Sequence, residues 1–477
     1  MKKHHRLYID GLWRAPSSKQ FAEIVNPATN QICARTPLAN EQDVIAAIEA
    51  ARAAFASWSQ TSARQRADFI HAAADEMENR RDDFIAAISQ TMGCPLHLTN
   101  DLQVQGSIDA FRTFAKMAFL MEEPEEKEGF MLIREAVGVC VLINPWNYPL
   151  SQLAGKMGPA LAAGCTMVVK PAEQTPLQDF IVAEVFDKIG LPAGVFNLVP
   201  GIGADLGPVL CGHPDVDMVS FTGSSAAGVK VSNAAAPGVK RVCLELGGKS
   251  PYIITEDADL AVAVRSGVEN VMNNSGQTCT ALTRMLVPES RYDEAVKMAK
   301  MVAEEIVVGD PQDPKTCMGP MSSSRQKNTV INYIEKGAAE GARLVTGGVE
   351  MPEGLPDGVK AGAYVRPTIF ADVNNDMSIA QEEIFGPVLC MIHYKDIDHA
   401  IEIANDTVYG LSSRVSAKDT PSALKIARRI RAGQCYVQGG RFNDEAPFGG
   451  YKQSGNGREW GEEGLMEYVE LKAIMYA

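Results

Sequence analysis

The chain has 477 residues, with 45 Lys and Arg residues against 59 Asp and Glu residues, and its formal net charge is −14. Hydrophobic residues make up 46% and charged residues 22% of the sequence, which is typical of a globular protein and excludes a disordered chain, a collagen-like repeat and a small disulfide-rich scaffold. The acidic balance, without a basic block, also argues against nucleic acid or an anionic membrane as the partner.

Two amphipathic helices are predicted near the N-terminus. Asn40, followed three residues later by Asp43, has the pattern of a helix N-cap and precedes an apolar stripe at helical spacing. A second helix is predicted over residues 62–92, and Gly93 marks its end. Further along, the charged segment 121–128 and the apolar run 130–133 predict either a solvated hairpin or a subunit-contacting arm.

From residue 137 the pattern changes to short β-branched runs separated by helix-length segments. The predicted strands are 137–143, 165–169, 195–199, 216–221 and 240–246. Strands that alternate with helices imply right-handed βαβ crossovers and a mostly parallel sheet covered on both faces, an architecture typical of nucleotide-binding proteins. Residues 248–450 repeat the alternation with longer connections and predict a second α/β domain, so the chain has at least two domains, as its length suggests.

Glycine-rich segments follow several of these strands. Segment 201–207 misses the G-x-G-x-x-G spacing by one residue and is better interpreted as a plain strand-to-helix turn. Segment 248–250 resembles the end of a P-loop, but Cys243 stands where that motif needs a glycine, which argues against ATP hydrolysis. Segment 221–228 enters a helix directly and could place backbone N–H groups and the Ser224 hydroxyl near a pyrophosphate.

The 10 cysteines are dispersed without any Cys-x-x-Cys pair, so neither a zinc ribbon nor any other metal site is predicted. Most of them are expected to be small, buried, reduced side chains. Cys279 differs because it lies in the polar segment 274–280, between two segments of helical pattern, where a thiol can have a lowered pKa and reach a ligand. No secretory signal or membrane-spanning run is found, and we expect a cytoplasmic protein.

Two further residues could act with a nucleophilic cysteine. None of the 7 histidines falls in a recognisable Cys–His pattern, whereas Glu245 ends a predicted strand, where burial would raise the pKa of its carboxyl group. The alternative is an inward-facing Glu paired with Lys or Arg. Asn147 follows strand 137–143, at the edge where ligands bind in open α/β sheets, and its amide could donate to an oxyanion. Otherwise it is a turn residue between two prolines.

Taken together, these segments resemble the aldehyde dehydrogenase superfamily over essentially the whole chain. The matching motifs are PWNYP (145–149), KPAEQTP (170–176), FTGS (221–224), ELGGK (245–249), GQTC (276–279), EEIFGP (382–387) and PFGGYK (447–452). The resemblance implies a Rossmann-like NAD-binding domain (1–116 and 137–247) and a second α/β catalytic domain (248–449). It also implies a small β oligomerisation arm with bridging segments (117–136 and 450–477), in a homodimer or a homotetramer.

The resemblance further implies oxidation of an aldehyde to the carboxylic acid. Cys279 would attack the aldehyde and form first a thiohemiacetal and then a thioester, while the Asn147 amide and the Cys279 N–H hold the oxyanion. Glu245 would activate the water that hydrolyses the thioester, and Lys156 and Glu459 match the positions that relay the proton.

The cofactor implied by the resemblance is NAD. The matching cofactor-binding residues are Ile143, Pro145, Trp146, Lys170, Glu173, Gly223, Ser224, Gly247, Glu383 and Phe385. Lys170 and Glu173 match the residues that hold the adenosine ribose. Because a carboxylate accepts ribose hydroxyls but repels a 2′-phosphate, NADP is expected to bind less well.

A substrate tunnel is implied as well. Its matching residues are Tyr148, Gln152, Gly155, Thr278, Thr280, Arg441, Phe442 and Phe448. Many relatives carry a bulky aromatic residue in place of Gly155, which predicts a wider tunnel and a bulky or aromatic aldehyde. Arg441 either faces a carboxylate or other acceptor on the substrate, or is solvated or paired with Asp444 or Glu445.

Other functions fit the sequence less well. An acylating enzyme would pass the thioester to coenzyme A, and the water-activating Glu245 argues against it. A thiol hydrolase would not need the cofactor motifs, and a non-catalytic binding protein would not need nucleophile, base and oxyanion donor together.

Overall fold

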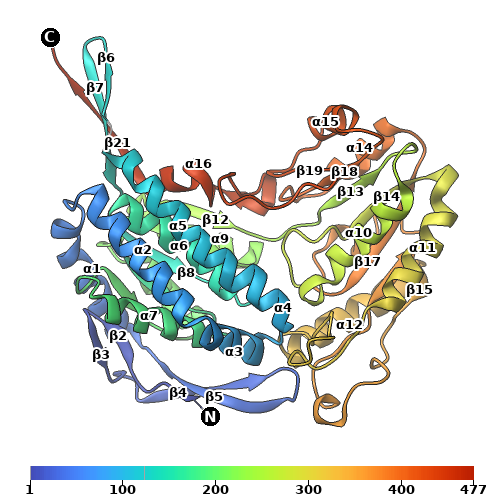
Figure 1. Ribbon diagram of the computed structural model, residues 1–477, viewed down its shortest axis with the longest axis horizontal. Coiled ribbons are helices and arrows are strands. Elements are labelled where there is room, and N and C mark those ends of the chain that lie inside the picture. The colour runs from blue at the N-terminus through green and yellow to red at the C-terminus, as the bar shows by residue number, and fades with distance from the viewer. Residues whose placement is uncertain (1, 123) are drawn as a thin grey trace.

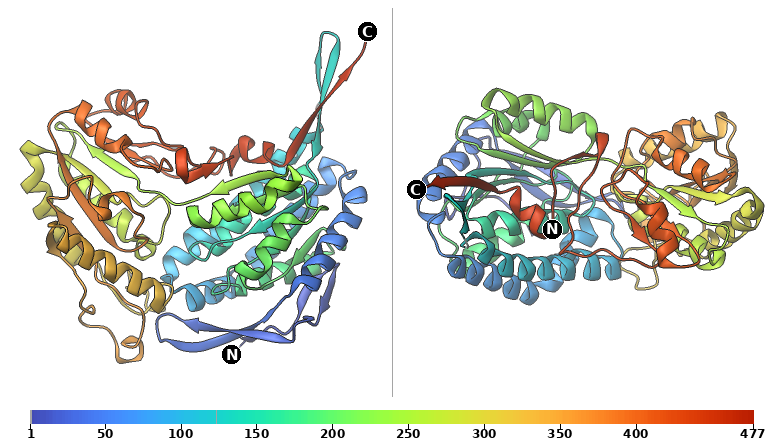
Figure 2. Two further views of the ribbon diagram at one scale, coloured as in Figure 1. Left: turned by 180° about the vertical axis from the view of Figure 1, so that it is seen from behind. Right: turned by 90° about the horizontal axis from the view of Figure 1, so that it is seen from above.

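The computed structural model describes residues 2–122 and 124–477. The chain forms two α/β lobes, and a narrow β-ribbon that carries the C-terminus projects from one of them (Figure 1). The view from above in Figure 2 shows the same two lobes and the projecting ribbon. This arrangement confirms the predicted fold class of two α/β units with a small β arm.

The first lobe is built on an eight-stranded sheet in the order β20-β12-β11-β8-β9-β10-β2-β3. Its strands are β2 (Leu7–Ile9), β3 (Leu12–Arg14), β8 (Val139–Ile143), β9 (Thr166–Lys170), β10 (Phe196–Leu198), β11 (Met218–Thr222), β12 (Arg241–Glu245) and β20 (Gly455–Asn456). The run from β12 to β10 is parallel, and only the edge strands are antiparallel. The predicted strands and their parallel pairing are therefore confirmed.

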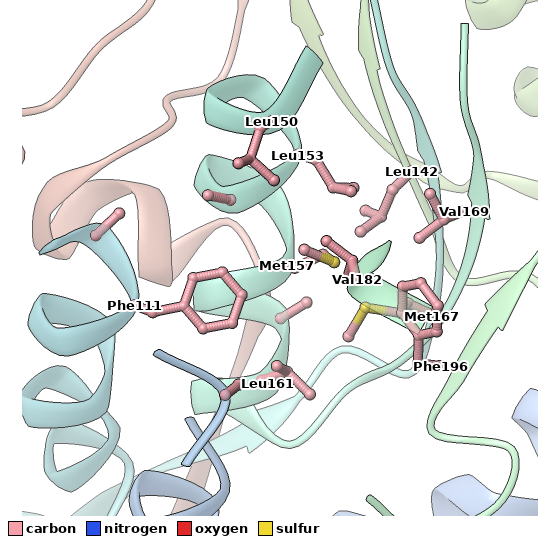
Figure 3. Close-up of a cluster of buried hydrophobic side chains, with 14 of the residues drawn as sticks. Phe111, Leu142, Leu150, Leu153, Met157, Leu161, Met167, Val169, Val182 and Phe196 are labelled. Atoms are coloured by element: carbon pink, nitrogen blue, oxygen red, sulfur yellow. The ribbon is translucent and has the colours of Figure 1, made fainter. Parts of the chain in front are cut away.

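Helices cover both faces of this sheet. They are α1 (Glu41–Trp58), α2 (Ala63–Asn79), α3 (Arg81–Met92), α4 (Leu96–Leu98), α5 (Gly106–Met117), α6 (Pro149–Ala163), α7 (Leu177–Ile189), α8 (Gly203–Gly212) and α9 (Ser225–Ala235). Successive residues of β8 point to opposite faces, so Leu142 joins one core with α2, α5, α6 and α7, while Val141 joins another with α1, α8 and α9. Figure 3 shows the first core, where Met157 and Leu161 of α6 lie between the sheet and Phe111.

The predicted helix ends are partly confirmed. Asn40 and Asp43 form a reciprocal capping box at the start of α1. The single helix predicted over 62–92 is wrong in one respect, because it breaks at Arg80 (φ −103°, ψ 15°) into α2 and α3. The apolar stripe continues across the break, so hydrophobic periodicity does not reveal it. The predicted end at Gly93 is confirmed by its φ of 79°.

The second lobe contains a seven-stranded sheet in the order β15-β16-β17-β14-β13-β18-β19. The strands of this sheet are β13 (Pro251–Ile254), β14 (Arg284–Pro288), β15 (Arg343–Thr346), β16 (Thr368–Ala371), β17 (Val388–Tyr394), β18 (Arg414–Ser416) and β19 (Tyr436–Val437). The helices of this lobe are α10 (Leu260–Met272), α11 (Tyr292–Glu305), α12 (Ser324–Ala339), α13 (Ser378–Gln381), α14 (Ile397–Asn405) and α15 (Thr420–Ala427). The segment after Cys279 was predicted to be helical, but it forms β14. All its residues are buried, so it lacks the alternation that would identify a strand.

The projecting ribbon joins distant parts of the chain. Strands β6 (Glu125–Lys127), β7 (Phe130–Ala136) and β21 (Val469–Met475) form an antiparallel sheet in which β21 pairs with β7 along its whole length. Of the two alternatives left open for the segment after residue 121, β6 and β7 form the hairpin, and contact with another subunit stays a prediction; Glu123 lies outside the described residues. Leu471 and Met475 are 64% and 74% exposed on this ribbon. The described chain also contains a small sheet of β1 (Lys2–Lys3), β4 (Gln20–Asn26) and β5 (Gln31–Leu38), and helix α16 (Gly461–Met466).

Candidate active site

Glu245 is the last residue of β12, and its carboxylate is buried without a partner. The residue is 2% exposed, and neither carboxylate oxygen accepts a hydrogen bond from any described residue. Burial raises the pKa of Glu245 well above its ordinary value, and the charge of Glu459 raises it further, against the opposing charges of Lys156 and Arg458. The prediction of a raised pKa is confirmed, and the alternative, a Glu paired with Lys or Arg, is not what the structure shows.

Cys279 lies in the loop between α10 and β14, at the edge of the second lobe that faces Glu245. Burial raises the pKa of its thiol far above the ordinary value, and the charges of Glu245, Glu383 and Glu459 add to the effect. The direction is opposite to the lowered pKa that a turn position suggested, because the loop packs among carboxylates. The thiol therefore needs a base to become nucleophilic, and an unpartnered carboxylate lies within electrostatic reach.

The loop before Cys279 has an unusual backbone. Asn274, Ser275 and Gly276 have φ values of 52°, 58° and 73°, three successive residues in the left-handed region. The Asn274 amide Nδ2 donates to the backbone oxygens of Asn147 (3.1 Å) and Gln277 (3.3 Å). These bonds tie the loop that carries the nucleophile to the segment that follows β8.

Asn147 reaches the same loop from the first lobe. It is buried, and its Nδ2 donates to the Gln277 oxygen at 3.0 Å. An amide nitrogen carries two hydrogens, so one remains available to a developing oxyanion next to Cys279.

Lys156 and Glu459 form a fully buried ion pair behind the base. Lys156 is on α6, and its Nζ lies 2.5 Å from Glu459 Oε1 with exposed side-chain fractions of 0% and 1%. Nζ also donates to Thr222 Oγ1 at 2.5 Å, a contact that no sequence motif indicated. Burial raises the pKa of Glu245, and the charge of this Glu459 raises it further.

A cavity of about 560 Å³ opens onto Cys279. Of the predicted tunnel residues, it is lined by Tyr148, Gln152, Thr278, Thr280, Arg441, Phe442 and Phe448. Tyr148 and Thr278 are linked through their hydroxyl groups at 2.8 Å. The lining also includes residues that were not predicted, among them Arg414, Tyr436 and Trp460.

Gly155 does not face this cavity, in contrast to the prediction. A Cβ atom there would lie 3.0 Å from the indole of Trp460, which covers this part of α6. The Trp460 ring also meets the Phe442 ring edge-on, with centroids 5.3 Å apart. The aromatic group that Gly155 lacks is supplied from the C-terminal segment, so the glycine itself does not widen the tunnel.

The residues predicted to hold the adenosine ribose lie at the end of β9. Lys170 Nζ donates to the backbone oxygens of Pro171 (2.7 Å) and Gly201 (3.0 Å) and lies 3.2 Å from Glu173 Oε1. The same carboxylate accepts the Gly203 N–H at 2.6 Å, and its side chain remains 49% exposed. A fixed, half-exposed carboxylate at the carboxyl edge of a parallel sheet fits a ribose hydroxyl pair.

Other predicted cofactor residues lie at the ends of β8 and β11 in the same sheet. Ser224 caps α9, where its hydroxyl accepts the Ala227 N–H, and the glycine before it follows β11. Ile143 ends β8, and the two residues after Asn144, Pro145 and Trp146, are half-buried. The start of α9 lies just after the end of β11, and a helix start in this position fits a pyrophosphate.

Glu383 and Phe385 complete the set from the second lobe. The Gly248 N–H donates to Glu383 Oε1 at 2.9 Å, and a Cβ at Gly247 would lie 2.4 Å from the other carboxylate oxygen, so this approach requires glycine. Burial raises the pKa of Glu383 to about 7. The Phe385 ring meets the Trp146 ring edge-on, with centroids 5.3 Å apart, and so joins the two lobes.

The sequence matches the aldehyde dehydrogenase family over residues 13–474. The chain belongs to this family. A 3-succinoylsemialdehyde-pyridine dehydrogenase from Pseudomonas sp is 48% identical over 476 residues, which cover 100% of this chain and 99% of the relative. This aldehyde dehydrogenase is thus an oxidoreductase that acts on the aldehyde group.

Solved structures agree with the family assignment. A mutant of aldehyde dehydrogenase C from Pseudomonas syringae, complexed with NAD+ and octanal, has a TM-score of 0.97 and 46% identity over 99% of this chain and 96% of its own. An aldehyde dehydrogenase from Mycobacterium tuberculosis complexed with NAD+ has a TM-score of 0.96 and 43% identity over 100% of this chain and 99% of its own.

The remaining predictions concern metals, membranes and the other thiols. No group of His, Cys, Asp and Glu that could hold a metal ion occurs among the described residues. No helix of the described chain is long and apolar enough to cross a membrane. Most of the other cysteines are buried, as predicted, whereas Cys317 is exposed and Cys435 is half-buried.

Proposed function

We propose that this aldehyde dehydrogenase oxidises aldehydes to carboxylic acids with NAD, through a covalent adduct at Cys279. The observation that carries the proposal is the buried Glu245 carboxylate, whose pKa is raised and whose two oxygens accept no hydrogen bond from the described residues. Its charge acts on the thiol of Cys279, which lines a large cavity. A base of this kind can take a proton from the thiol or from water near neutral pH.

The first step is addition to the aldehyde. Glu245 takes the proton of the Cys279 thiol and passes it to the buried Glu459 and Lys156 pair, so the base is free again for the second step. The Cys279 sulfur then forms a bond to the carbonyl carbon, and the carbonyl π electron pair moves to oxygen. The free N–H of the Asn147 amide and the Cys279 backbone N–H then donate to this oxyanion. A nicotinamide dinucleotide, when bound, supplies a hydride acceptor, and loss of hydride from the adduct leaves a thioester on Cys279.

The second step is hydrolysis. Glu245 takes a proton from a water molecule, which attacks the thioester carbon and releases the acid and the Cys279 sulfur. The proton then leaves Glu245 through the buried Glu459 and Lys156 pair. Because this base serves water, transfer of the thioester to coenzyme A is disfavoured.

The cofactor preference follows from Glu173. Its carboxylate is positioned by Lys170 and the Gly203 N–H, so it accepts ribose hydroxyls and repels the 2′-phosphate of NADP. The complexes of the Pseudomonas syringae and Mycobacterium tuberculosis enzymes with NAD+ support the choice of NAD. Residues 1–116 and 137–247 form the NAD-binding domain in this proposal, and residues 248–449 form the catalytic domain.

The substrate is a bulky or aromatic aldehyde. Tyr148, Tyr436, Phe442, Phe448 and Trp460 give the cavity aromatic walls, and its volume suits a molecule much larger than acetaldehyde. The names of the relatives support this size, since one is described with a pyridine semialdehyde and another was solved with octanal.

Segments 117–136 and 450–477 pair subunits in the proposed homodimer or homotetramer. The ribbon of β6, β7 and β21 exposes apolar side chains and a strand edge, which a second subunit would cover. The cytoplasmic location stays a prediction from the sequence.

The test is NADH formation with a panel of aldehydes. Wild type is compared with Cys279→Ala and with Cys317→Ala, a control for loss of a thiol that is exposed and outside the cavity. Turnover is expected to disappear only in Cys279→Ala, and Glu245→Gln is expected to retain a thioester that intact-protein mass spectrometry detects. Turnover by Cys279→Ala at the wild-type rate, or strict dependence of wild type on coenzyme A, would overturn the proposal.

A further inference from the structure

Arg414 is a fixed cation in the wall of the substrate cavity. It begins β18, where it pairs in register with Tyr252 of β13 and Tyr436 of β19, so the three side chains stand in a row on one face of the sheet. Its guanidinium lies 5.8 Å from the centre of each tyrosine ring, and Nη1 donates to Ser266 Oγ at 2.8 Å. Two rings and a hydroxyl therefore hold the guanidinium in place.

No counter-ion of this cation occurs in the part of the chain that the structure describes. Among the described residues no carboxylate lies within ion-pair distance of Arg414, and its Nε is buried without an acceptor. Burying a charge without a partner is unfavourable, and the penalty is offset when an anion arrives. The half-buried guanidinium lines the cavity that Cys279 also lines, so its free N–H groups are accessible to a bound substrate.

The charged side chains that line the cavity have a positive balance. Arg441 on the loop at the mouth is exposed and makes no ion pair with any described residue, so the pairing with Asp444 or Glu445 that the sequence left open is not formed. Of the described residues that line the cavity, Asp101 alone carries a carboxylate, and it accepts a hydrogen bond from Asn100 at 2.7 Å. Two arginines thus face one carboxylate in a chain whose net charge is −14.

We infer that the preferred aldehydes carry a carboxylate at the end remote from the carbonyl, and that Arg414 binds it, with Arg441 attracting it at the mouth. The inference rests on the proposed function, since the same cavity must hold the aldehyde at Cys279. A guanidinium presents parallel N–H groups that match a carboxylate in geometry and charge. The aromatic walls of the cavity suit an apolar spacer between the two ends of the molecule.

The test uses pairs of aldehydes that differ only in charge. One pair is 4-formylbenzoate and 4-formylbenzamide. The other pair, suberic semialdehyde and its amide, has a longer spacer between the two ends of the molecule. We expect wild type to prefer the acid in at least one pair, and Arg414→Gln to lower the acid-to-amide ratio of kcat/KM by about tenfold or more, mainly through KM. Taking this ratio within each enzyme cancels the different reactivities of the two aldehydes.

Two further variants give the inference a control. Arg431 also lies over a tyrosine ring, that of Tyr451 at 6.0 Å, but does not line the cavity, so Arg431→Gln should leave the ratio unchanged. Arg414→Lys, which keeps the charge, should retain part of the preference. The inference would be overturned if wild type preferred the amide to the acid in both pairs. It would also be overturned if Arg414→Gln left the acid-to-amide ratio of kcat/KM unchanged.

A binding measurement separates this inference from the proposed function. Calorimetric titration of Cys279→Ala with 4-formylbenzoate and 4-formylbenzamide does not require turnover, so it decides the charge preference even if wild type oxidises neither. Added salt should weaken binding of the acid and not of the amide. If Arg414→Gln does not fold, Arg441→Gln is combined with Cys279→Ala and titrated in the same way. Equal affinities of Cys279→Ala for the acid and the amide at low salt would refute the carboxylate site.

Discussion

Replacement of Lys156 by Met tests the buried ion pair behind the base. In wild type the Lys156 ammonium contacts Glu459 at 2.5 Å and Thr222 at 2.5 Å, with no exposed side-chain area on Lys156. Loss of the cation would leave the Glu459 carboxylate buried close to that of Glu245. Because the pair is fully buried, solvent screening does not reduce the effect, and we expect the free energy of unfolding to fall by about 3–5 kcal/mol.

The assay is urea unfolding with calorimetry, at about pH 6 and about pH 8. For a chain of this length the loss corresponds to a decrease in Tm of roughly 3–5 °C. The loss of stability should be smaller at the lower pH, because Lys156 no longer lowers the pKa of Glu245, which then takes up a proton more readily. The double variant Lys156→Met/Glu459→Leu should recover most of the stability. A single variant within about 1 kcal/mol of wild type, or a double variant no more stable than the single, would refute this reasoning.

Three more predictions concern the base, the cofactor site and the glycine of α6. Because burial raises the folded-state pKa of Glu245, wild type loses stability as pH rises above the ordinary carboxyl pKa of about 4.3. Glu245→Gln lacks this loss, so calorimetry should give the variant a higher Tm than wild type at about pH 8. Its kcat should fall by roughly 100-fold or more, because the base is gone. A lower Tm at that pH would contradict this account. Glu173→Gln removes the charge that opposes a 2′-phosphate, so the ratio of kcat/KM for NAD over NADP should fall, and comparable values for both cofactors in wild type would rule out the role of Glu173. Gly155→Ala places a Cβ 3.0 Å from Trp460 and should lower the unfolding free energy by about 1–3 kcal/mol, measured in urea, whereas wild-type stability would show that Trp460 moves freely.

The sequence was sufficient to predict the frame of the first lobe. Strands such as β8 and β9 are β-branched runs bounded by Gly, Pro or Asn, and the box of Asn40 and Asp43 is local, so both follow from nearby residues. The break at Arg80 and strand β14 were missed for a physical reason. Burial on both faces makes a strand uniformly apolar, and a short apolar run can equally belong to a helix.

The site could be predicted only in part. Glu245 and Asn147 lie at or just after strand ends, and parallel strands bring those ends to one edge, so their approach follows from topology. The raised pKa of Cys279 could not be predicted, because it depends on burial in the folded chain and on carboxylates that three distant segments bring together. The same holds for Arg414, whose access to the cavity depends on the pairing of β18 with its neighbours, and for Trp460.

The arrangement of charge around Glu245 explains why a buried carboxylate is left unpaired. An ion pair between Glu245 and Lys156 would stabilise the folded protein, but it would also lower the pKa of Glu245 and make it a weak base. Instead Lys156 is bound to Glu459, and the Glu459 charge raises the pKa of Glu245 further. The base therefore keeps both oxygens free for water or the thiol, and its strength comes from an interaction that lowers the stability of the fold.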